Sequence, residues 1–301
     1  MEADSTDTIT QRHVAGIIPV AGQPLDFKFD WSDCLMPIAP DYTAIERSVV
    51  ECAYAGCQTI WIICNDDISP LIRHRIGEYI QDPVYCNRRL DQFPSESRRP
   101  IPIFYSPIHP KDRDKRDCLG WSVLHGALTA FKVSNGLSRW VAPHRYYVSF
   151  PYGAYPPEFV REHRKEISGH SLFYLRCNGK TVRDGEYLGF TFDSDSYKRF
   201  RSNVREMGTG IYVPTTDPSS HSVEKLPMEK RYSARHFSLD IVFNCAIIEQ
   251  ARVIDVPWYY NIDSWEKYCK FIGSDERSKL VRPDKRLLSY NEWNQIGQDE
   301  E

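Results

Sequence analysis

The sequence lacks the features that mark several classes of protein. No apolar run approaches the roughly 18 residues needed to cross a bilayer, and the polar, acidic residues 1–12 do not have the pattern of a signal peptide. Neither charge dominates, with 38 basic and 41 acidic side chains, which argues against a nucleic-acid binder that works through its overall field. We therefore expect a cytoplasmic protein that binds neither membranes nor nucleic acid.

Motifs for thiol, zinc or serine chemistry are also missing. The nine cysteines form no CxxC pair and no Cys/His group at zinc-binding spacing. An odd, scattered set is typical of reduced thiols that fill core volume. Nothing resembles GxSxG, and no nucleophile motif contains any of the histidines considered, which are His109, His125, His144 and His236.

What is present is an ordinary globular composition in 301 residues, 41% hydrophobic and 26% charged, with many aromatic side chains. Short apolar runs alternate with helical patterns along most of the chain. Strands are predicted near 13–20, 58–64, 101–105, 146–150, 171–176, 187–192 and 252–257. Helices are predicted from the Thr43–Glu46 capping box, from Ser69-Pro70 with apolar positions to Ile80, near 121–131, and over 156–167, 193–205, 238–248 and 264–271.

This alternation predicts an α/β fold of three α/β/α layers with a mixed, mostly parallel sheet, Rossmann-like in layout. We expect one domain over residues 13–273, preceded by a flexible tail (1–12) and followed by a charged extension (274–301).

A long loop, residues 21–41, follows the first strand and therefore lies by topology over the ligand-binding edge of the sheet. Backbone N–H groups near Ala21, Gly22 and Gln23 could cradle a phosphate, with Lys28, the only cation of the loop, as its counter-charge. A proline-braced surface loop is the alternative.

Two further groups are candidates for the same edge. Asp66-Asp67 follows the second strand and could bind a metal or ribose hydroxyls, although we favour a cap for the next helix. Trp121, Tyr152 and Tyr155 could stack on a base or sugar, or pack in the core; the loop position of the two tyrosines predicts exposure.

Several segments, in order, resemble the sugar-phosphate nucleotidyltransferases, a family of the nucleotidyltransferase-like, GT-A type. The matching segments are residues 17–22, 35–38, 45–49, 55–63, 117–122, 188–193 and 259–268. They correspond to the family's nucleotide loop, its LLPI segment, a helix ending in AG with the second strand, an LGTA turn near the base, a GIYVFD strand and a late WxDIDTWEDY segment. The resemblance covers roughly residues 14–272 and implies that family's fold.

The resemblance also implies a function: transfer of a nucleotidyl group from a nucleoside triphosphate to a phosphorylated sugar or related acceptor, with Mg²⁺. Lys28 and Asp263 would then carry catalysis, and Asp263 would hold the metal. The implied nucleotide contacts are Ala21, Gly22, Gln23, Gly120 and Trp121, and the implied substrate contacts are Tyr152, Gly153 and Lys180.

The sequence departs from the family at its charged positions. Gln23-Pro24-Leu25 stands in the family's GGxGTR loop and Asp33-Cys34 in place of its Lys-Pro, so the arginine and lysine that grip the triphosphate are missing. The family's GD after the strand 146–150 becomes residues 151–154, without a carboxylate. Cations at 111–116 and Lys180 could substitute, although the alternating signs of 111–117 favour a solvated loop.

Two alternatives therefore stay open. The chain could be a catalytically inactive relative that acts as a nucleotide-binding, regulatory or structural subunit. It could also be a glycosyltransferase that uses a nucleotide sugar, with Asp66-Asp67 as its metal site. A nucleotide or nucleotide sugar is the expected ligand, and assembly into a homo-oligomer is compatible with each alternative.

Overall fold

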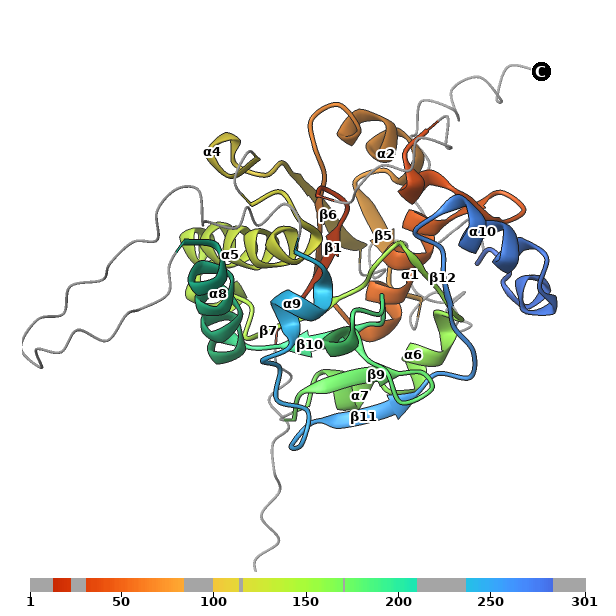
Figure 1. The fold of residues 1–301 in the computed structure, drawn as a ribbon. Helices are drawn as coiled ribbons and strands as arrows, with labels where there is room; N and C mark the ends of the chain where they lie inside the picture. The colour runs from red at the N-terminus through yellow and green to blue at the C-terminus, as the bar shows by residue number, and fades with distance from the viewer. Residues whose placement is uncertain are drawn as a thin grey trace, which may run out of the picture.

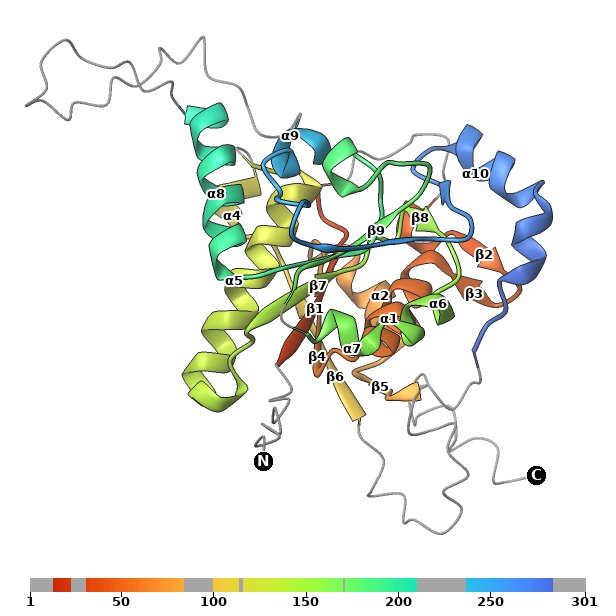
Figure 2. The same ribbon diagram turned by 90° about the horizontal axis from the view of Figure 1, so that it is seen from below.

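The computed structural model describes residues 13–22, 31–83, 100–113, 116–169, 171–209 and 237–283. An eight-stranded sheet runs through the middle of the molecule, with helices on both faces (Figures 1 and 2). In spatial order its strands are β11 (Arg252–Asp255), β9 (Phe173–Arg176), β10 (Phe190–Phe192), β7 (Arg145–Val148), β1 (Val14–Pro19), β4 (Thr59–Ile63), β6 (Pro100–Ser106) and β5 (Tyr79–Gln81).

The centre of this sheet is parallel. Strand β1 pairs in parallel with β4 and β7, and β4 pairs in parallel with β6. Strand β10 runs antiparallel to β7 and β9, and β5 runs antiparallel to β6. The prediction of a mixed, mostly parallel α/β sheet is confirmed. The carboxyl ends of β1, β4, β6 and β7 consequently meet at one edge.

Helices cover the two faces (Figure 2). On one face lie α5 (Leu119–Leu137), α8 (Ser194–Thr209) and α9 (Leu239–Phe243), and on the other α1 (Ala44–Ala55), α6 (Glu158–Glu162) and α7 (Arg164–Ile167). The remaining helices are α2 (Ser69–Ile76), α4 (Pro110–Arg113), α10 (Trp265–Ile272) and the 3₁₀ turns η1 (Asp33–Leu35), η3 (Arg139–Val141), η4 (Val182–Asp184) and η7 (Asp275–Lys279). Within the described ranges, no helix combines the length and apolar character needed to span a membrane.

Two small antiparallel ribbons are separate from the main sheet. They are β2 (Pro37–Ala39) with β3 (Tyr42–Thr43), and β8 (Gly153–Ala154) with β12 (Tyr260–Asn261). Together with α10 they enclose a smaller apolar cluster that also buries Leu280. Beyond it, the Arg282 guanidinium contacts the carboxylates of Asp41 and Glu46. The domain limits themselves stay a prediction.

Local signals explain the helix that follows the long loop. The Thr43 hydroxyl accepts a hydrogen bond from the Glu46 N–H, and the Glu46 carboxylate accepts one from the Thr43 N–H, so the predicted capping box is present. Gly56 ends α1 in the left-handed region at φ +86°, where glycine has no steric cost.

Some predicted elements are wrong. Helix α2 ends at Ile76, because Gly77 (φ +88°) redirects the chain, and Ile80 belongs to strand β5. The helix predicted over 238–248 ends at Phe243, and the one over 156–167 is split into α6 and α7. On α5, Phe131 was expected on the buried face but is 43% exposed.

An ion pair without solvent contact lies within α1, on the side that faces the end of β7. The Arg47 guanidinium donates to the Glu51 carboxylate and to the Phe150 carbonyl oxygen, both at 2.7 Å. Burial lowers the pKa of Arg47, but the Glu51 carboxylate and the hydroxyl groups of Tyr155 and Tyr42 together more than offset this effect, so the pKa lies above its ordinary value. The Arg47 guanidinium therefore stays charged.

The same carboxylate accepts hydrogen bonds from three hydroxyl groups of β7 and the segment that follows it. Glu51 accepts hydrogen bonds from Tyr147 (2.5 Å), Ser149 (2.6 Å) and Tyr155 (2.6 Å). Burial and the Glu51 charge raise the pKa of both tyrosines well above the usual range, so both stay protonated donors. The segment 147–155 is thereby fixed to α1.

Replacing Glu51 with alanine should lower the free energy of unfolding by about 3–5 kcal/mol, because it leaves the Arg47 charge buried without its partner. Glu78→Ala is the matched control, since Glu78 pairs with Arg73 at the exposed surface, where ion pairs contribute little. Urea unfolding followed by tryptophan fluorescence measures both. Equal losses in the two variants would contradict the central role of the buried pair.

Candidate functional site

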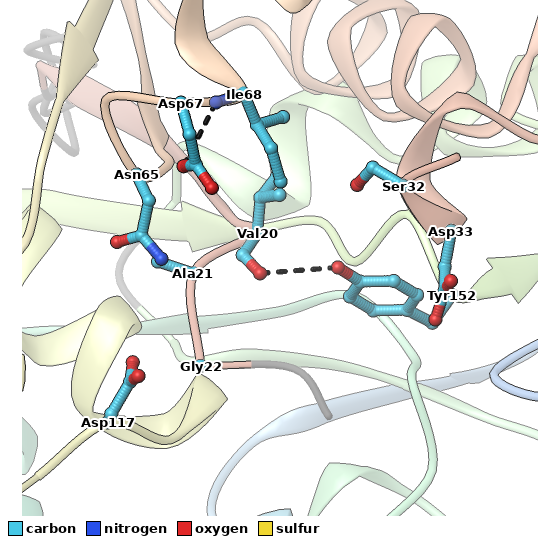
Figure 3. Close-up of a pocket in the computed structure, with 10 residues that line it drawn as sticks. All are labelled: Val20, Ala21, Gly22, Ser32, Asp33, Asn65, Asp67, Ile68, Asp117 and Tyr152. Atoms are coloured by element: carbon cyan, nitrogen blue, oxygen red, sulfur yellow. Dashed lines mark hydrogen bonds between the residues drawn. The ribbon is translucent and has the colours of Figure 1, made fainter. Parts of the chain in front are cut away.

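A cavity of about 190 Å³ lies at the edge where β1, β4 and β7 end (Figure 3). Its walls come from five parts of the chain. Val20, Ala21 and Gly22 follow β1; Asn65, Asp67 and Ile68 follow β4; Tyr152 follows β7; Ser32 and Asp33 lie at the start of η1, and Asp117 precedes α5. This is where open α/β sheets place their ligands.

Backbone contacts hold the β1 side of the cavity. The N–H groups of Val20 and Ala21 both donate to the Ile63 carbonyl oxygen at 2.8 Å, which ties the end of β1 to the end of β4. The Tyr152 hydroxyl donates to the Val20 carbonyl oxygen at 3.3 Å. The loop after β1 and the segment after β7 are therefore joined across the cavity (Figure 3).

Gly22 permits a close approach between this loop and the start of α5. It has φ +86°, and a side-chain carbon there would lie 2.5–2.7 Å from backbone atoms of Cys118. Any other residue at position 22 would therefore be strained in its backbone and would push the Cys118 backbone away.

The start of α5 packs beside the cavity rather than into it. Gly120 allows α9 to approach, since a side-chain carbon would lie 2.6 Å from Val242. Trp121 is 7% exposed, and the Arg116 guanidinium lies 4.7 Å from its ring centre. Neither Gly120 nor Trp121 is among the residues that line the cavity.

The cavity is acidic. Asp33, Asp67 and Asp117 contribute carboxylates to its walls, and none of the described lining residues is basic. The nearby Arg113 and Arg116 pair with Asp66 and Asp112, outside the lining. Gln23 and Lys28, predicted to bind the phosphates and their charge, lie outside the described residues.

Asp263 sits behind the Tyr152 wall. The neighbouring Ile262 N–H donates to the Tyr152 carbonyl oxygen at 2.8 Å. The Asp263 carboxylate accepts from Lys267 Nζ at 2.7 Å and from the Tyr187 hydroxyl at 3.2 Å. The Tyr187 ring in turn packs against the Tyr152 ring, with centres 5.5 Å apart. Asp263 itself does not line the cavity.

These contacts do not fit a preformed Mg²⁺ site. Both carboxylate oxygens of Asp263 are already engaged, one of them by an ammonium group. The segment after β7 supplies no second carboxylate, and the described residues contain no group of three acidic, histidine or cysteine side chains placed to hold a metal. Mg²⁺ takes oxygen ligands from carboxylates and phosphates, and a metal at Asp263 would first have to displace the Lys267 ammonium group.

The two tyrosines predicted at the site have different places in the structure. Tyr152 lines the cavity, whereas Tyr155 is fully buried on Glu51; the predicted exposure of both is wrong, because Glu51 draws this segment inward. Gly153 lies in β8, where its lack of a side chain admits the Tyr187 backbone. Lys180 is 63% exposed, 3.8 Å from a Glu186 oxygen, and does not line the cavity.

The favoured reading of Asp66-Asp67 as a helix cap is wrong. The N-cap of α2 is Ile68, without a side-chain cap. Asp67 accepts from the Ile68 N–H at 3.0 Å and lines the cavity, whereas Asp66 pairs with Arg113 at 2.7 Å. The two carboxylates therefore have separate partners and do not form the metal-binding pair that was the alternative.

Sequence reasoning gave no role to Ser32, Asn65 or Ile68, which line the cavity. Their position directly after a strand, or at the end of the long loop, was the available signal. The thiols of Cys34 and Cys118 lie nearby, but burial raises their pKa to about 12 and about 11. Thiolate chemistry is not what this site offers.

Comparison with known proteins shows the fold. No protein-family model and no curated protein matches the sequence. The structure is similar to that of a protein assigned as a glucose-1-phosphate thymidylyltransferase from Bacillus anthracis, in complex with sucrose, with a TM-score of 0.52 at 10% identity over 91% of this chain and 98% of that one. This chain therefore has the nucleotidyltransferase-like fold, and the resemblance found in the sequence is confirmed at that level.

Two other solved structures are similar at lower TM-scores. They are 4-diphosphocytidyl-2C-methyl-D-erythritol synthase from Anaerococcus prevotii (TM-score 0.47, 10% identity, 89% of this chain and 97% of that one) and Rv0371c from Mycobacterium tuberculosis in complex with manganese (0.42, 12%, 88% and 100%).

Gly22→Ala should lower the free energy of unfolding by at least about 1–2 kcal/mol, the cost of a left-handed alanine, before the contact with Cys118 is counted. Gly136→Ala in α5 has open space around it and should be neutral or stabilising by about 0.5–1 kcal/mol. Thermal and urea unfolding compare the two variants. A neutral Gly22→Ala would show that the loop does not need this conformation.

Proposed function

We propose that this chain binds a nucleotide or a nucleotide sugar in the cavity and does not transfer the nucleotidyl group. The observation that carries this proposal is the cavity itself, at the carboxyl ends of β1, β4 and β7 in a nucleotidyltransferase-like fold. Such edges are the ligand sites of open α/β sheets.

The charges support binding without transfer. Nucleotidyl transfer develops negative charge on the α-phosphate and on the leaving pyrophosphate, and that charge needs cationic groups nearby. The described cavity wall offers carboxylates instead. Asp33 stands where the family resemblance places a phosphate-binding lysine, and it is only 3% exposed. Asp263, the remaining metal-ligand position, is paired with Lys267.

A second candidate is the transfer of a nucleotidyl group from a nucleoside triphosphate to a phosphorylated sugar. The position of Asp263 favours it, because this carboxylate follows a segment hydrogen-bonded to Tyr152 in the cavity wall. In this case Lys28 would counter the phosphate charge, and Ala21, Gly22 and Gln23 would border the phosphates. Gly153 and Lys180 would lie on the acceptor side.

Binding is tested by titrating UDP-glucose, dTDP-glucose, GDP-mannose and the nucleoside triphosphates while following the unfolding temperature. A ligand at 100 times its Kd should add about 2.7 kcal/mol of stability. Asn65→Ala should weaken that ligand about three- to tenfold, since one neutral hydrogen bond is worth about 0.5–1.5 kcal/mol. Without ligand, this variant should unfold at the wild-type temperature. If none of these ligands shifts unfolding, the proposal fails.

Transfer is tested separately, by pyrophosphate release from each nucleoside triphosphate with Mg²⁺ and sugar phosphates. We expect none above the rate without protein. Release that Asp263→Asn abolishes, in a variant that still unfolds like the wild type, would establish the second candidate and overturn the first.

A further inference from the structure

A groove of about 420 Å³ lies between α2 and the chain from Trp31 to Thr43, and is called here the α2 groove. Its apolar and aromatic lining consists of Trp31, Leu35, Pro37, Tyr42 and Leu71. Two of these side chains are open to solvent, since Trp31 is 51% exposed and Leu71 is 58% exposed. Exposed apolar side chains that gather in one place mark a surface that packs against another group.

Hydrogen bonds fix the two sides of the α2 groove. The Trp31 indole N–H donates to the Met36 sulfur at 2.9 Å, which holds the exposed ring in place. The Arg75 guanidinium on α2 donates to the backbone and side-chain oxygens of Asp41 at 2.7 and 2.9 Å. Because both Asp41 and Arg75 line the groove, this contact joins its two sides.

The α2 groove shares two elements with the cavity at the strand ends. In the 3₁₀ turn η1, Asp33 lines the cavity and Leu35 lines the groove. At the start of α2, Ile68 lines the cavity and Leu71 lines the groove. A group that fills the groove therefore contacts two elements that also form cavity walls.

The structure describes the chain as far as Pro283, and it leaves the chain beside this groove. Leu280 is buried in the cluster formed with α10 and the small ribbons. The Arg282 guanidinium then pairs with the carboxylates of Asp41 and Glu46, and Asp41 belongs to the groove lining. Residue 287 comes four positions after Pro283, so it lies at most about 14 Å further along the chain.

The residues that follow have side chains suited to an apolar groove. Between polar positions they include Leu287, Leu288, Tyr290, Trp293 and Ile296. Burial of such side chains is favourable in proportion to the apolar area removed from water. A short connection also gives the segment an effective concentration in the millimolar range, so a modest intrinsic affinity is enough to hold it.

We propose that residues 287–296 pack into the α2 groove of their own chain and cover Trp31 and Leu71. The segment thereby braces η1 against α2, on the outer side of two cavity walls. Arg282, held by Asp41 and Glu46, sets the point from which the segment enters the groove. This packing goes beyond the proposed function and does not depend on which ligand the cavity takes.

A double-mutant cycle in the full chain tests the packing through the unfolding temperature. Leu71→Ala and Trp293→Ala should each lower it by about 3 °C or more, because each removes buried apolar area. The loss in the double variant should be at least about 2 °C smaller than the sum of the single losses, because both side chains belong to one interface. No loss in either single variant, or fully additive losses, would overturn the proposal.

Leu137→Ala is the matched control. Leu137 is the last residue of α5, is 79% exposed and lies outside the groove lining. This substitution should change the unfolding temperature by less than about 1 °C and should add to Trp293→Ala. If it coupled to Trp293→Ala as strongly as Leu71→Ala does, the groove would not be where the segment packs.

Photo-cross-linking places the segment directly. With p-benzoylphenylalanine at position 293 of the full chain, irradiation should give a monomer in which that position is joined to residues 31–43 or 69–76, as identified by mass spectrometry. Leu71→Glu puts a charge in the groove and should remove most of this product.

The other cross-linking results decide against the proposal. A product of twice the mass would assign the groove to a second copy of the chain, and links only to other parts of the monomer would place the segment elsewhere. Both would overturn packing within one chain. Because no nucleotide takes part in these measurements, their failure would leave the proposed function to its own ligand titration.

Discussion

The buried pair of Arg47 and Glu51 is the interaction on which the geometry of the site depends. One carboxylate accepts hydrogen bonds from Tyr147, Ser149 and Tyr155, and so fixes the chain both before and after Tyr152. A charge without solvent is tolerated only when every partner is in place. The segment after β7 therefore has little freedom, and Tyr152 takes its place in the cavity wall.

The segment that Glu51 holds also positions residues 260–263 near the C-terminal end of the domain. Strand β8 pairs with β12, and the Ile262 N–H donates to the Tyr152 carbonyl oxygen, so Asp263 is positioned through the same segment. The positions of Tyr152 and Asp263, more than a hundred residues apart in the chain, thus both depend on the segment that Glu51 holds. The fold keeps the arrangement of a nucleotidyltransferase-like protein. The described residues that line the cavity, however, include carboxylates and no basic side chain. A fold fixes where a site lies, and its side chains decide the chemistry.

The charge at this edge separates the two functional candidates. Phosphate chemistry calls for cations, whereas the described cavity wall presents carboxylates, and the N–H groups of Val20 and Ala21 are bonded to the Ile63 carbonyl oxygen. Nucleotidyl transfer would need Asp263 to leave Lys267 and would depend on Lys28 for positive charge.

The sequence alone determined the elements governed by local rules. The β1–α1–β4 unit, the Thr43 capping box, the Gly56 helix end and the site's position at the strand ends follow from periodicity, capping chemistry and the direction of parallel strands. Only the tertiary structure decided which side chains face the cavity. Asp66 and Asp67 are adjacent, yet a distant Arg113 holds one of them away from the cavity, and Glu51 draws Tyr155 into the core. Such outcomes depend on partners remote in the chain, and no local pattern encodes them.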